Sequence, residues 1–387
     1  MPESLRKAYK FKLKPTPEQE RVLAETLWQC RRLYNTALEQ RITLYRQRGV
    51  SLTCYQQQAE LPDLKAAFPE YAAINAQVLQ DVLTRLDKTY QAFFRRVKAG
   101  QTPGFPRYQG KDRWHSFTYK QVGEHGGARL DNGCLVLSKI GRIAVRWSRP
   151  IEGAPKTVTI SREADGWYVC ISCADVTAQP LPLTGQETGI DLGLESFATL
   201  ADGTLIHNPR CYRRAERRLK TAQRKVSRRT KGSARRRKAV KLLAKAHQTV
   251  KRQRADFQHK TALQLVRQFD TIYHEELQTA NMVRNHHLAK SIADVGWSAF
   301  LSILSFTAAY AGRSVVAVPP AYTSQTCSGC GVIVAKGLSV RWHSCPDCGA
   351  SLHRDHNAAL NILERGRESA DGQSVQAITW PVGASVA

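Results

Sequence analysis

Residues 188–193 read Thr-Gly-Ile-Asp-Leu-Gly, a short apolar run typical of a buried strand and interrupted by Asp191. A second apolar run, Thr-Ile-Tyr-His at 271–274, meets another acid, Glu275. Burying an unpaired carboxylate is unfavourable, so acids at strand ends usually bind a cation or face a basic group. The two junctions therefore predict strands of a mixed α/β domain that carry acidic groups with a chemical role.

A third acid, Asp355, stands at the expected start of a helix that contains Ala358, Ala359, Ile362 and Leu363. Each acid alone has an ordinary structural role open to it, as a helix cap for Asp355 and as strand-edge charges for the other two. Three well-separated acids together could hold two Mg²⁺ ions around a phosphodiester that is to be cut. The pattern therefore predicts a candidate metal-dependent phosphodiesterase site.

Two Cys-x-x-Cys pairs precede this helix, with the segment 331–344 between them, and a glycine follows each pair. The pairs are Cys327 with Cys330 and Cys345 with Cys348. Four thiolates can enclose one tetrahedral Zn²⁺ and leave no open coordination position, so the predicted zinc site is structural. Gly331 and Gly349 favour the tight turns that such a site needs.

The remaining six cysteines are scattered, which favours a reducing compartment over a disulfide framework. Cys170 and Cys173 also have Cys-x-x-Cys spacing, but they lie in an alternating strand pattern that points them to opposite faces. The stretch from Met1 to Pro15 contains no apolar signal-peptide core. Because we find no continuous apolar run of about 18 residues, we expect a soluble intracellular protein without a membrane partner.

Positive charge dominates the composition, since 58 Lys and Arg face 32 Asp and Glu to give a formal net charge of +26. Between Arg210 and Arg254 there are 20 Lys and Arg against one acid, Glu216, so this segment alone carries +19. A solvated helical pair is the ordinary interpretation, but self-repulsion on this scale favours binding to a nucleic-acid backbone. The candidate nucleic-acid-binding residues are Arg213, Arg214, Arg217, Arg218, Arg224, Lys225, Arg228, Arg229, Arg235, Arg236, Arg237, Lys238, Arg252 and Arg254.

Changes of periodicity along the chain predict its organisation. Residues 9–14 alternate as a strand, Thr16-Pro17-Glu18-Gln19 opens a helix, and a second helix covers about 75–98. Short alternating runs over 117–174, with turns at Asn132-Gly133 and Asp165-Gly166, predict a small β-barrel or sandwich. A Pro- and Gly-containing linker at 180–185 precedes a mixed α/β pattern, and the sparsely charged end predicts a poorly ordered tail.

The motifs resemble those of the TnpB family, which are RuvC-like nucleases encoded beside bacterial insertion-sequence transposases and related to type V CRISPR effectors. The resemblance runs nearly end to end. It includes Gly-Phe-Pro-Arg at 104–107, Gly-Ile-Asp-Leu-Gly at 189–193, Glu-Glu-Leu at 275–277, Thr-Ser-Gln-Thr-Cys at 323–327 and Arg-Asp-His-Asn-Ala-Ala-Leu-Asn-Ile at 354–362. Where this chain has Glu276 the family often has Asp, but strand alternation lets only one of two neighbours face the metals, and the motif's register favours Glu275.

The resemblance implies an α+β and α/β multidomain fold, a β-barrel with a helical insert followed by an RNase H-like (RuvC) nuclease domain with a zinc ribbon. The implied boundaries are 1–15 and 105–183 for the barrel, 16–104 for the helical recognition domain, 184–322 and 350–366 for the nuclease with its basic insertion 208–256, 323–349 for the ribbon and 367–387 for the tail. It also implies cleavage of double-stranded target DNA, directed by a guide RNA from the transposon end, and a cytoplasmic, nucleoid-associated place in a bacterium or archaeon. Catalytic Mg²⁺ at Asp191, Glu275 and Asp355 and structural Zn²⁺ at the four cysteines would be the cofactors.

Two other classes of protein remain to be considered. A nuclease-inactive, RNA-guided or direct DNA-binding regulator would be marked by loss of an acid, and all three acids are present. A transposase of the neighbouring class would need a His-x-His metal motif with a nucleophilic Tyr, and no two of the 11 histidines have that spacing. An assay of metal-dependent cleavage with and without co-purified RNA separates the three classes.

Overall fold

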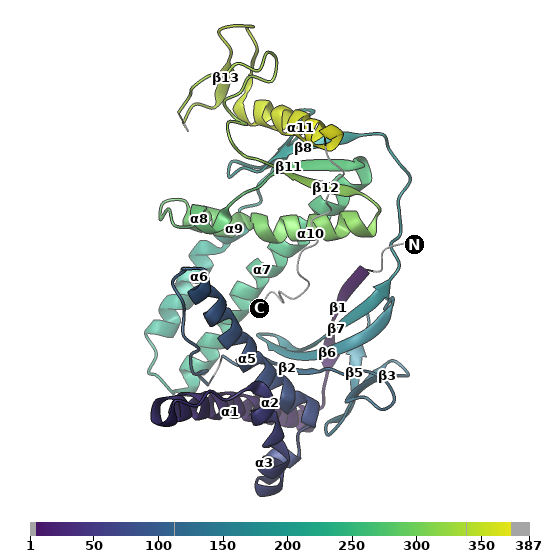
Figure 1. Cartoon of the computed structure of the whole chain (residues 1–387), viewed down its shortest axis with the longest axis vertical. Coiled ribbons are helices and arrows are strands. Elements are labelled where there is room, and N and C mark those ends of the chain that lie inside the picture. The colour runs from purple at the N-terminus through teal and green to yellow at the C-terminus, as the bar shows by residue number, and fades with distance from the viewer. Residues whose placement is uncertain (1–4, 112, 338, 373–387) are drawn as a thin grey trace. The chain divides into compact units, whose positions relative to one another are not determined.

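The structure is a computed structural model that describes residues 5–111, 113–337 and 339–372. The chain divides into two compact units, the first ending at Thr177 and the second beginning at Ala178 (Figure 1). Each unit has its own sheet and its own core. The chain is therefore a multidomain α/β protein, as the sequence predicts.

The first unit contains a curled antiparallel sheet of seven strands in the order β2-β6-β7-β1-β5-β4-β3. The strands are β1 (Leu5–Lys14), β2 (Ser116–Tyr119), β3 (Ala128–Asp131), β4 (Cys134–Leu137), β5 (Gly141–Arg146), β6 (Ala154–Glu163) and β7 (Gly166–Val176). Val122, just after β2, bridges to Ala128 at the start of β3, so the two ends of the sheet approach each other. The predicted barrel-like sheet with the N-terminal strand inside it is confirmed.

Between β1 and β2, the described residues form five helices. They are α1 (Pro17–Arg48), α2 (Cys54–Ala59), α3 (Leu61–Ala67), α4 (Pro69–Ala72) and α5 (Ala76–Lys98). The α1 helix begins with the predicted capping box, in which the Thr16 hydroxyl accepts from the Gln19 N–H and the Gln19 side chain accepts from the Thr16 N–H. Asn75 caps α5 by accepting from the Gln77 N–H. Both long helices start where the sequence places them.

The second unit contains a five-stranded mixed sheet in the order β10-β9-β8-β11-β12. Its strands are β8 (Glu187–Asp191), β9 (Ser196–Leu200), β10 (Leu205–His207), β11 (Thr271–Glu275) and β12 (Ser314–Val318). The β8, β11 and β12 strands run parallel to one another, whereas β9 runs antiparallel to both of its neighbours, β8 and β10. Parallel neighbours end at the same edge of a sheet, and this edge receives both predicted acids.

Helices cover both faces of this sheet (Figure 1). They are α6 (Cys211–Ser227), α7 (Ala234–Gln268), α8 (Thr279–Met282), α9 (Ala289–Val295), α10 (Trp297–Tyr310) and α11 (Arg354–Gly372). Phe300 and Leu304 of α10 pack with Leu265 of α7 and Ile190 of β8 in the main core. The α11 helix packs on the other face, and the small hairpin of β13 (Trp342–Ser344) and β14 (Ser351–His353) precedes it.

One stretch, Ala289–Tyr310, is long and apolar enough to cross a membrane by length and composition alone. In the structure it is two helices, because Gly296 adopts a left-handed conformation (φ 68°) between α9 and α10. Ile292, Trp297 and Phe300 from this stretch lie in the core of the second unit. Packing in this core therefore accounts for part of its hydrophobicity, since 33% of the apolar window is buried.

Two expected boundaries differ from the structure. The stretch predicted as a linker is hydrogen-bonded to the second unit, since the Gln179 N–H donates to Tyr310 O (2.7 Å) and the Leu181 N–H donates to Ala311 O (3.0 Å). The division between units therefore falls at residue 177 rather than 183. The last helix continues to Gly372, past the expected start of the tail at 367, and residues 373–387 lie outside the described part of the chain.

Candidate active site

The structure brings the three predicted acids to one edge of the second sheet. Asp191 is the last residue of β8 and Glu275 the last residue of β11, and these parallel strands pair with His274 opposite Ile190. Asp355 lies in the first turn of α11, the helix packed on β8. Three segments that are far apart in sequence therefore deliver one carboxylate each.

A glycine makes this arrangement possible. A Cβ at Gly189 would lie 2.2 Å from Ala359 O and 2.6 Å from Leu363 N, so any side chain there would push α11 away from β8. Beyond the acid of β8, a Cβ at Gly193 would lie 3.9 Å from Asp355 Oδ2. The backbone contact between strand and helix thus places Asp355 close to the strand that ends at Asp191.

The electrostatics of the site disfavour a bare cluster of carboxylates. Burial raises the pKa of Asp191 well above its ordinary range, and the negative charges of Glu275 and Asp355 raise it further. Burial also raises the pKa of Glu275. A positive charge among the three groups would remove both penalties, which is the usual state of a metal-binding carboxylate cluster.

The structure distinguishes the two neighbouring glutamates. Glu275 is half-buried beside Asp191, and its Oε1 accepts a hydrogen bond from the Thr323 hydroxyl. Glu276 is exposed, and its backbone N–H donates to Val318 O of β12. The geometry therefore brings Glu275, not Glu276, together with the other two acids.

Thr323, Asn357 and Asn361 connect these acids to the cysteine-rich segment. Thr323 is 3% exposed, and its carbonyl accepts from Asn361 Nδ2 (2.8 Å). Asn357 and Asn361 each donate to Thr326 O at 2.7 Å, and Asn357 Oδ1 accepts from the Ser328 N–H (3.0 Å). Sequence reasoning assigned these residues no role, although two asparagines four positions apart on the apolar face of a helix indicate buried amide hydrogen bonds.

The four predicted zinc ligands form one compact group. Their sulfur atoms all lie within 4.8 Å of one another, with 3.6 Å between Cys327 and Cys348 and between Cys330 and Cys345. Zinc–sulfur bonds of about 2.3 Å in a tetrahedron place sulfurs about 3.8 Å apart, so the group fits one Zn²⁺. Backbone N–H groups of Cys348 and Asp347 lower the pKa of Cys345 to about 7, whereas the pKa values of Cys330 and Cys348 are raised, with hydrogen bonds among the thiols contributing.

Among the described residues, this is the only group of three or more Cys, His, Asp and Glu side chains whose ligand atoms all lie within 4.8 Å of one another. The other Cys-x-x-Cys pair behaves as expected, because Cys170 is half-buried and Cys173 is buried on the opposite face of β7.

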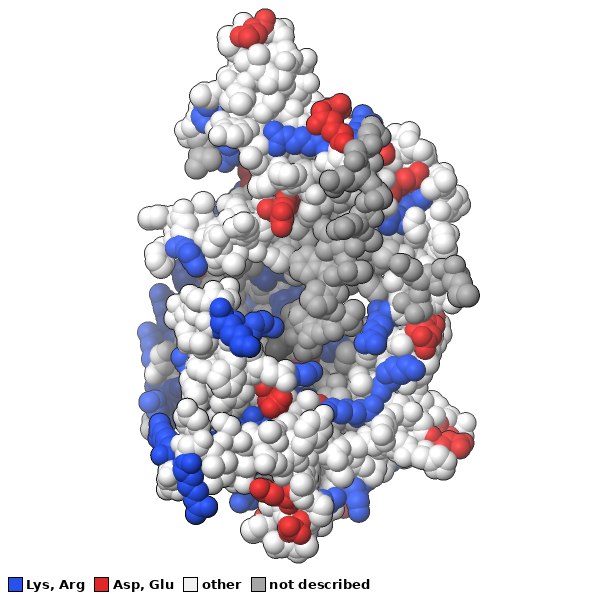
Figure 2. All heavy atoms as spheres, viewed as in Figure 1, with Lys and Arg blue, Asp and Glu red and all other residues white. Residues whose placement is uncertain are grey.

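The basic segment forms a hairpin of α6 and α7 with a small core of Cys211, Leu219, Ala246 and Val250. Lys and Arg side chains crowd the left-hand edge of Figure 2, where Figure 1 places the turn of this hairpin. The candidate nucleic-acid-binding residues are exposed on it, with two exceptions, Arg236 and Arg254.

Those two arginines bind the protein itself. Arg236 Nη1 donates to Val226 O (3.0 Å) and Arg229 O (3.1 Å), which satisfies carbonyls at the end of α6. Arg254 Nη2 pairs with Asp294 Oδ1 (3.1 Å). These two candidates therefore already have protein partners, which only the fold brings near them, and the assignment of the basic segment to nucleic acid stays a prediction.

Comparison with known families gives matches over most of the chain. Residues 168–286 match the family described as "Probable transposase", and residues 297–362 match "Cas12f1-like, TNB domain". Residues 1–50 match a family described as "Helix-turn-helix domain". In the described part of that last range the structure has the strand β1 and the single long helix α1.

Two bacterial relatives match almost the entire chain. The "Putative RNA-guided DNA endonuclease" of Streptomyces pristinaespiralis is 36% identical over 389 residues, which cover 95% of this chain and 90% of that protein. The "Putative RNA-guided DNA endonuclease InsQ" of Escherichia coli strain K12 is 29% identical, covering 95% of this chain and 94% of that protein.

A solved structure shares the fold. The protein chain in the "Cryo-EM structure of the Cas12f1-sgRNA-target DNA complex" superposes with a TM-score of 0.57. The two chains are 14% identical, and the match covers 93% of this chain and 98% of that one. The likeness supports the predicted succession of a curled sheet with a helical insert and an α/β unit with a cysteine-rich ribbon.

Proposed function

This chain belongs to the TnpB family, and on that premise we propose that it is an RNA-guided DNA endonuclease of an insertion sequence. Its partners would be a guide RNA from the transposon end and a double-stranded DNA target, in the cytoplasm of a bacterium or archaeon. The observation that carries the proposal is the meeting of Asp191, Glu275 and Asp355 at one sheet edge, where burial and mutual repulsion favour a cation.

We propose further that these carboxylates hold two Mg²⁺ ions. Metal ions in two-metal sites lie about 3.5–4 Å apart, which spreads their ligands more widely than a single ion does. Asp191, whose charge interacts with both other acids, could serve both ions. Bound Mg²⁺ would polarise the phosphoryl group and stabilise the attacking and leaving oxygens of a hydrolysed phosphodiester.

The proposal is tested with the protein purified together with its RNA. Sequencing that RNA identifies the guide, and a DNA duplex complementary to it is then offered with Mg²⁺, with EDTA or after RNase treatment. We expect cutting only when both metal and RNA are present. Guide-dependent DNA binding without cutting, under every metal tested, would instead identify a nuclease-inactive regulator.

Thr323 is expected to act as a positioning residue for Glu275. The Thr323→Val substitution removes the hydroxyl that donates to the Glu275 carboxylate, and a hydrogen bond to a charged group contributes about 1.5–3 kcal/mol. Because this bond lowers the pKa of Glu275, its loss should raise that pKa further and weaken metal binding. We expect about tenfold more Mg²⁺ to be needed for half-maximal cleavage, with a smaller defect as the pH rises.

Two further variants make this measurement specific. Thr323→Ser keeps the hydroxyl and should restore the wild-type Mg²⁺ dependence. Thr326→Val is the matched control, because the Thr326 hydroxyl donates only to Tyr322 O (3.0 Å) in the same loop. Equal Mg²⁺ dependence of Thr323→Val and wild-type protein would show that this hydroxyl does not position Glu275.

Exposed basic residues of the α6–α7 hairpin are expected to contact phosphates without reading bases. The test is the triple variant Arg235→Gln, Arg237→Gln and Lys238→Gln. A plot of log affinity for RNA against log salt concentration should have a shallower slope in this variant. Each lost phosphate contact reduces the slope by about 0.7, so three lost contacts reduce it by about two. Arg236 is left unchanged because it supports the hairpin.

The control keeps the charge at the same three positions, as Arg235→Lys, Arg237→Lys and Lys238→Arg, and should retain the wild-type slope. RNA titrations across a range of salt concentrations, with two different guide sequences, give both slopes. Parallel lines for the Gln variant and wild type would mean that this end of the hairpin is a solvated surface, whose charges salt screens.

A further inference from the structure

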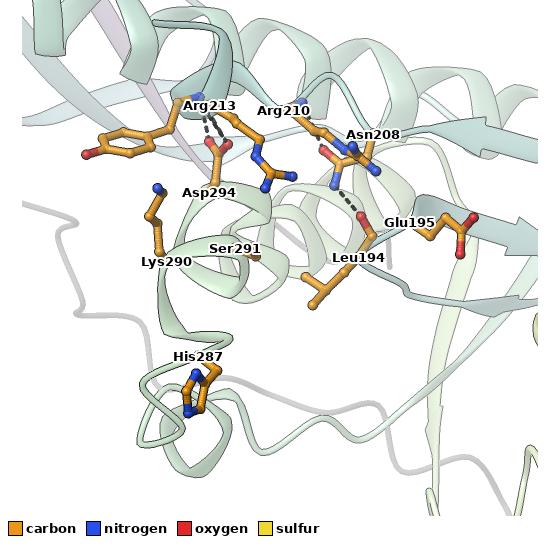
Figure 3. Close-up of a pocket in the computed structure, with 10 residues that line it drawn as sticks. Leu194, Glu195, Asn208, Arg210, Arg213, His287, Lys290, Ser291 and Asp294 are labelled. Atoms are coloured by element: carbon orange, nitrogen blue, oxygen red, sulfur yellow. Dashed lines mark hydrogen bonds between the residues drawn. The ribbon is translucent and has the colours of Figure 1, made fainter. Parts of the chain in front are cut away.

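A cavity of about 400 Å³ lies within the second unit, separate from the three acids (Figure 3). Its walls are the loop after β8 at Leu194 and Glu195, the segment 208–213 that leads into α6, and the segment 287–294 that includes α9. Arg210, Arg213 and Lys290 contribute positive charge to it. Its volume lies in the range of about 300–1,000 Å³ that is usual for small-ligand sites.

The acids of this cavity are already engaged. Asp294 accepts from the backbone N–H groups of Tyr212 (2.8 Å) and Arg213 (3.3 Å), and it pairs with Arg254. Glu195 lies 3.6 Å from Arg341. Their negative charges are therefore partly neutralised by groups that belong to the protein.

The cations of the cavity differ in their partners. Across the described part of the chain, neither Arg210 nor Arg213 makes an ion pair, whereas Lys290 pairs with Glu216 (2.7 Å). Figure 3 shows the guanidinium of Arg213 turned towards the space between α9 and the segment that precedes α6. The cavity thus presents two guanidinium groups that no described carboxylate neutralises, and their geometry matches that of a phosphate.

Arg210 is held in an unusual backbone conformation. Its φ of 46° and ψ of 49° lie in the left-handed region that residues other than glycine seldom occupy. Asn208 fixes this turn, since its Oδ1 accepts from the Arg210 N–H (3.0 Å) and its Nδ2 donates to Leu194 O (2.9 Å). Strain that the surrounding structure maintains is common at binding sites.

The same contacts tie the cavity to the catalytic edge. Leu194 and Glu195 closely follow Asp191 in the chain, and Gly193 just before them lies against Asp355. Arg341, the partner of Glu195, also lowers the pKa of Asp191 by its positive charge. A DNA strand whose phosphodiester lies at the three acids would therefore reach this cavity with nucleotides close to the point of cleavage.

We propose that this cavity binds one nucleotide of the single DNA strand being cut, with its phosphate on Arg210 and Arg213. The proposal rests on the proposed nuclease function and adds a subsite that holds the strand in register beside the three acids. A nucleotide inside a duplex is stacked and paired, whereas a nucleotide of an unpaired strand is free to enter a cavity of this size. Binding here would act on strand affinity and not on the chemical step.

The test uses the full chain loaded with its guide RNA and a single-stranded DNA substrate. In the double variant Arg210→Gln and Arg213→Gln, we expect KM for the strand to rise at least about tenfold with little change in kcat, as for lost ground-state contacts. Arg267→Gln with Arg284→Gln is the matched control, because it removes the same charge from two exposed arginines that neither line the cavity nor belong to the candidate nucleic-acid-binding residues. Its KM for the strand should equal that of the wild type.

Neutral methylphosphonate linkages, placed one at a time along the strand, locate the contact. One position should weaken binding to the wild-type protein and have no further effect in the Arg210→Gln and Arg213→Gln variant. An unchanged KM in that variant would overturn the proposal, and weakened guide-RNA binding instead would assign the cavity to RNA. Absence of cleavage by the wild type would contradict the proposed function, and this outcome is distinct from an unchanged KM in the variant.

Discussion

Replacing Asp191 with Ala should reduce DNA cleavage by about a thousandfold or more while guide-RNA and target binding persist. Metal ions contribute several kcal/mol to the stabilisation of a phosphoryl-transfer transition state, and a change of about 1.4 kcal/mol is a factor of ten in rate. The negative charges of Glu275 and Asp355 both act on Asp191, so loss of Asp191 should disturb both proposed metal positions. Single-turnover cleavage and filter binding measure the two properties on the same preparation.

Glu275→Ala and Asp355→Ala should have effects of the same order, whereas the exposed Glu276 provides a matched control. Glu276→Ala should cut at nearly the wild-type rate. Full cleavage by Glu275→Ala together with loss in Glu276→Ala would show that the other glutamate of the pair faces the metals.

Asp191→Asn separates a catalytic role from a structural one. Because the pKa of Asp191 is raised in the folded protein, its charged form is unfavourable there at neutral pH, and stability falls as the pH rises above the unfolded value. Removing the charge should therefore leave the metal-free protein at least as stable as wild type in thermal unfolding, although cleavage is lost. A marked drop in Tm would point to a structural role instead.

Local sequence rules predicted much of the fold because they act within a few residues. The capping box at Thr16 and the turn at Asn132 and Gly133 depend only on neighbouring side chains and backbone angles. The strand ends at Asp191 and Glu275 were also predictable, since a carboxylate that closes an apolar run needs a cation or a basic group beside it. The sequence spacing did not show that the two strands are neighbours; in the structure they are adjacent and parallel, so the two acids lie at the same sheet edge.

Contacts between distant segments could not be predicted in this way. Asp294 accepts from backbone N–H groups of α6 that lie 81 and 82 residues earlier. The same carboxylate forms an ion pair with Arg254. The Thr323 hydroxyl reaches Glu275 across 48 residues. Such pairs depend on how the elements pack, so the composition of the basic segment indicated its partner but not which of its arginines are available.

Loss of zinc should disorder the ribbon and impair cleavage without unfolding the second unit. Binding of Zn²⁺ to four thiolates contributes about 10–16 kcal/mol of apparent free energy in small domains, far more than so short a segment gains from its own core. The main core of the second unit contains no residue of the ribbon. We therefore expect about one Zn²⁺ per chain, lost in Cys345→Ala, with protease sensitivity confined to residues around 327–350.

The ribbon's effect on cleavage should exceed that of Thr323→Val, because the hydrogen bonds from Asn357 and Asn361 hold the whole segment from Thr323 to Ser328 against α11. Without a folded ribbon, this segment would lose its anchor at Cys327, and Glu275 would lose its hydroxyl donor together with the alignment of α11. Cys170→Ser is the control, since that thiol lies on β7 and its loss should leave zinc content unchanged. Metal analysis and cleavage rates on the same samples decide the matter: a zinc-free protein that cuts at the wild-type rate would show that the ribbon and the three acids act independently.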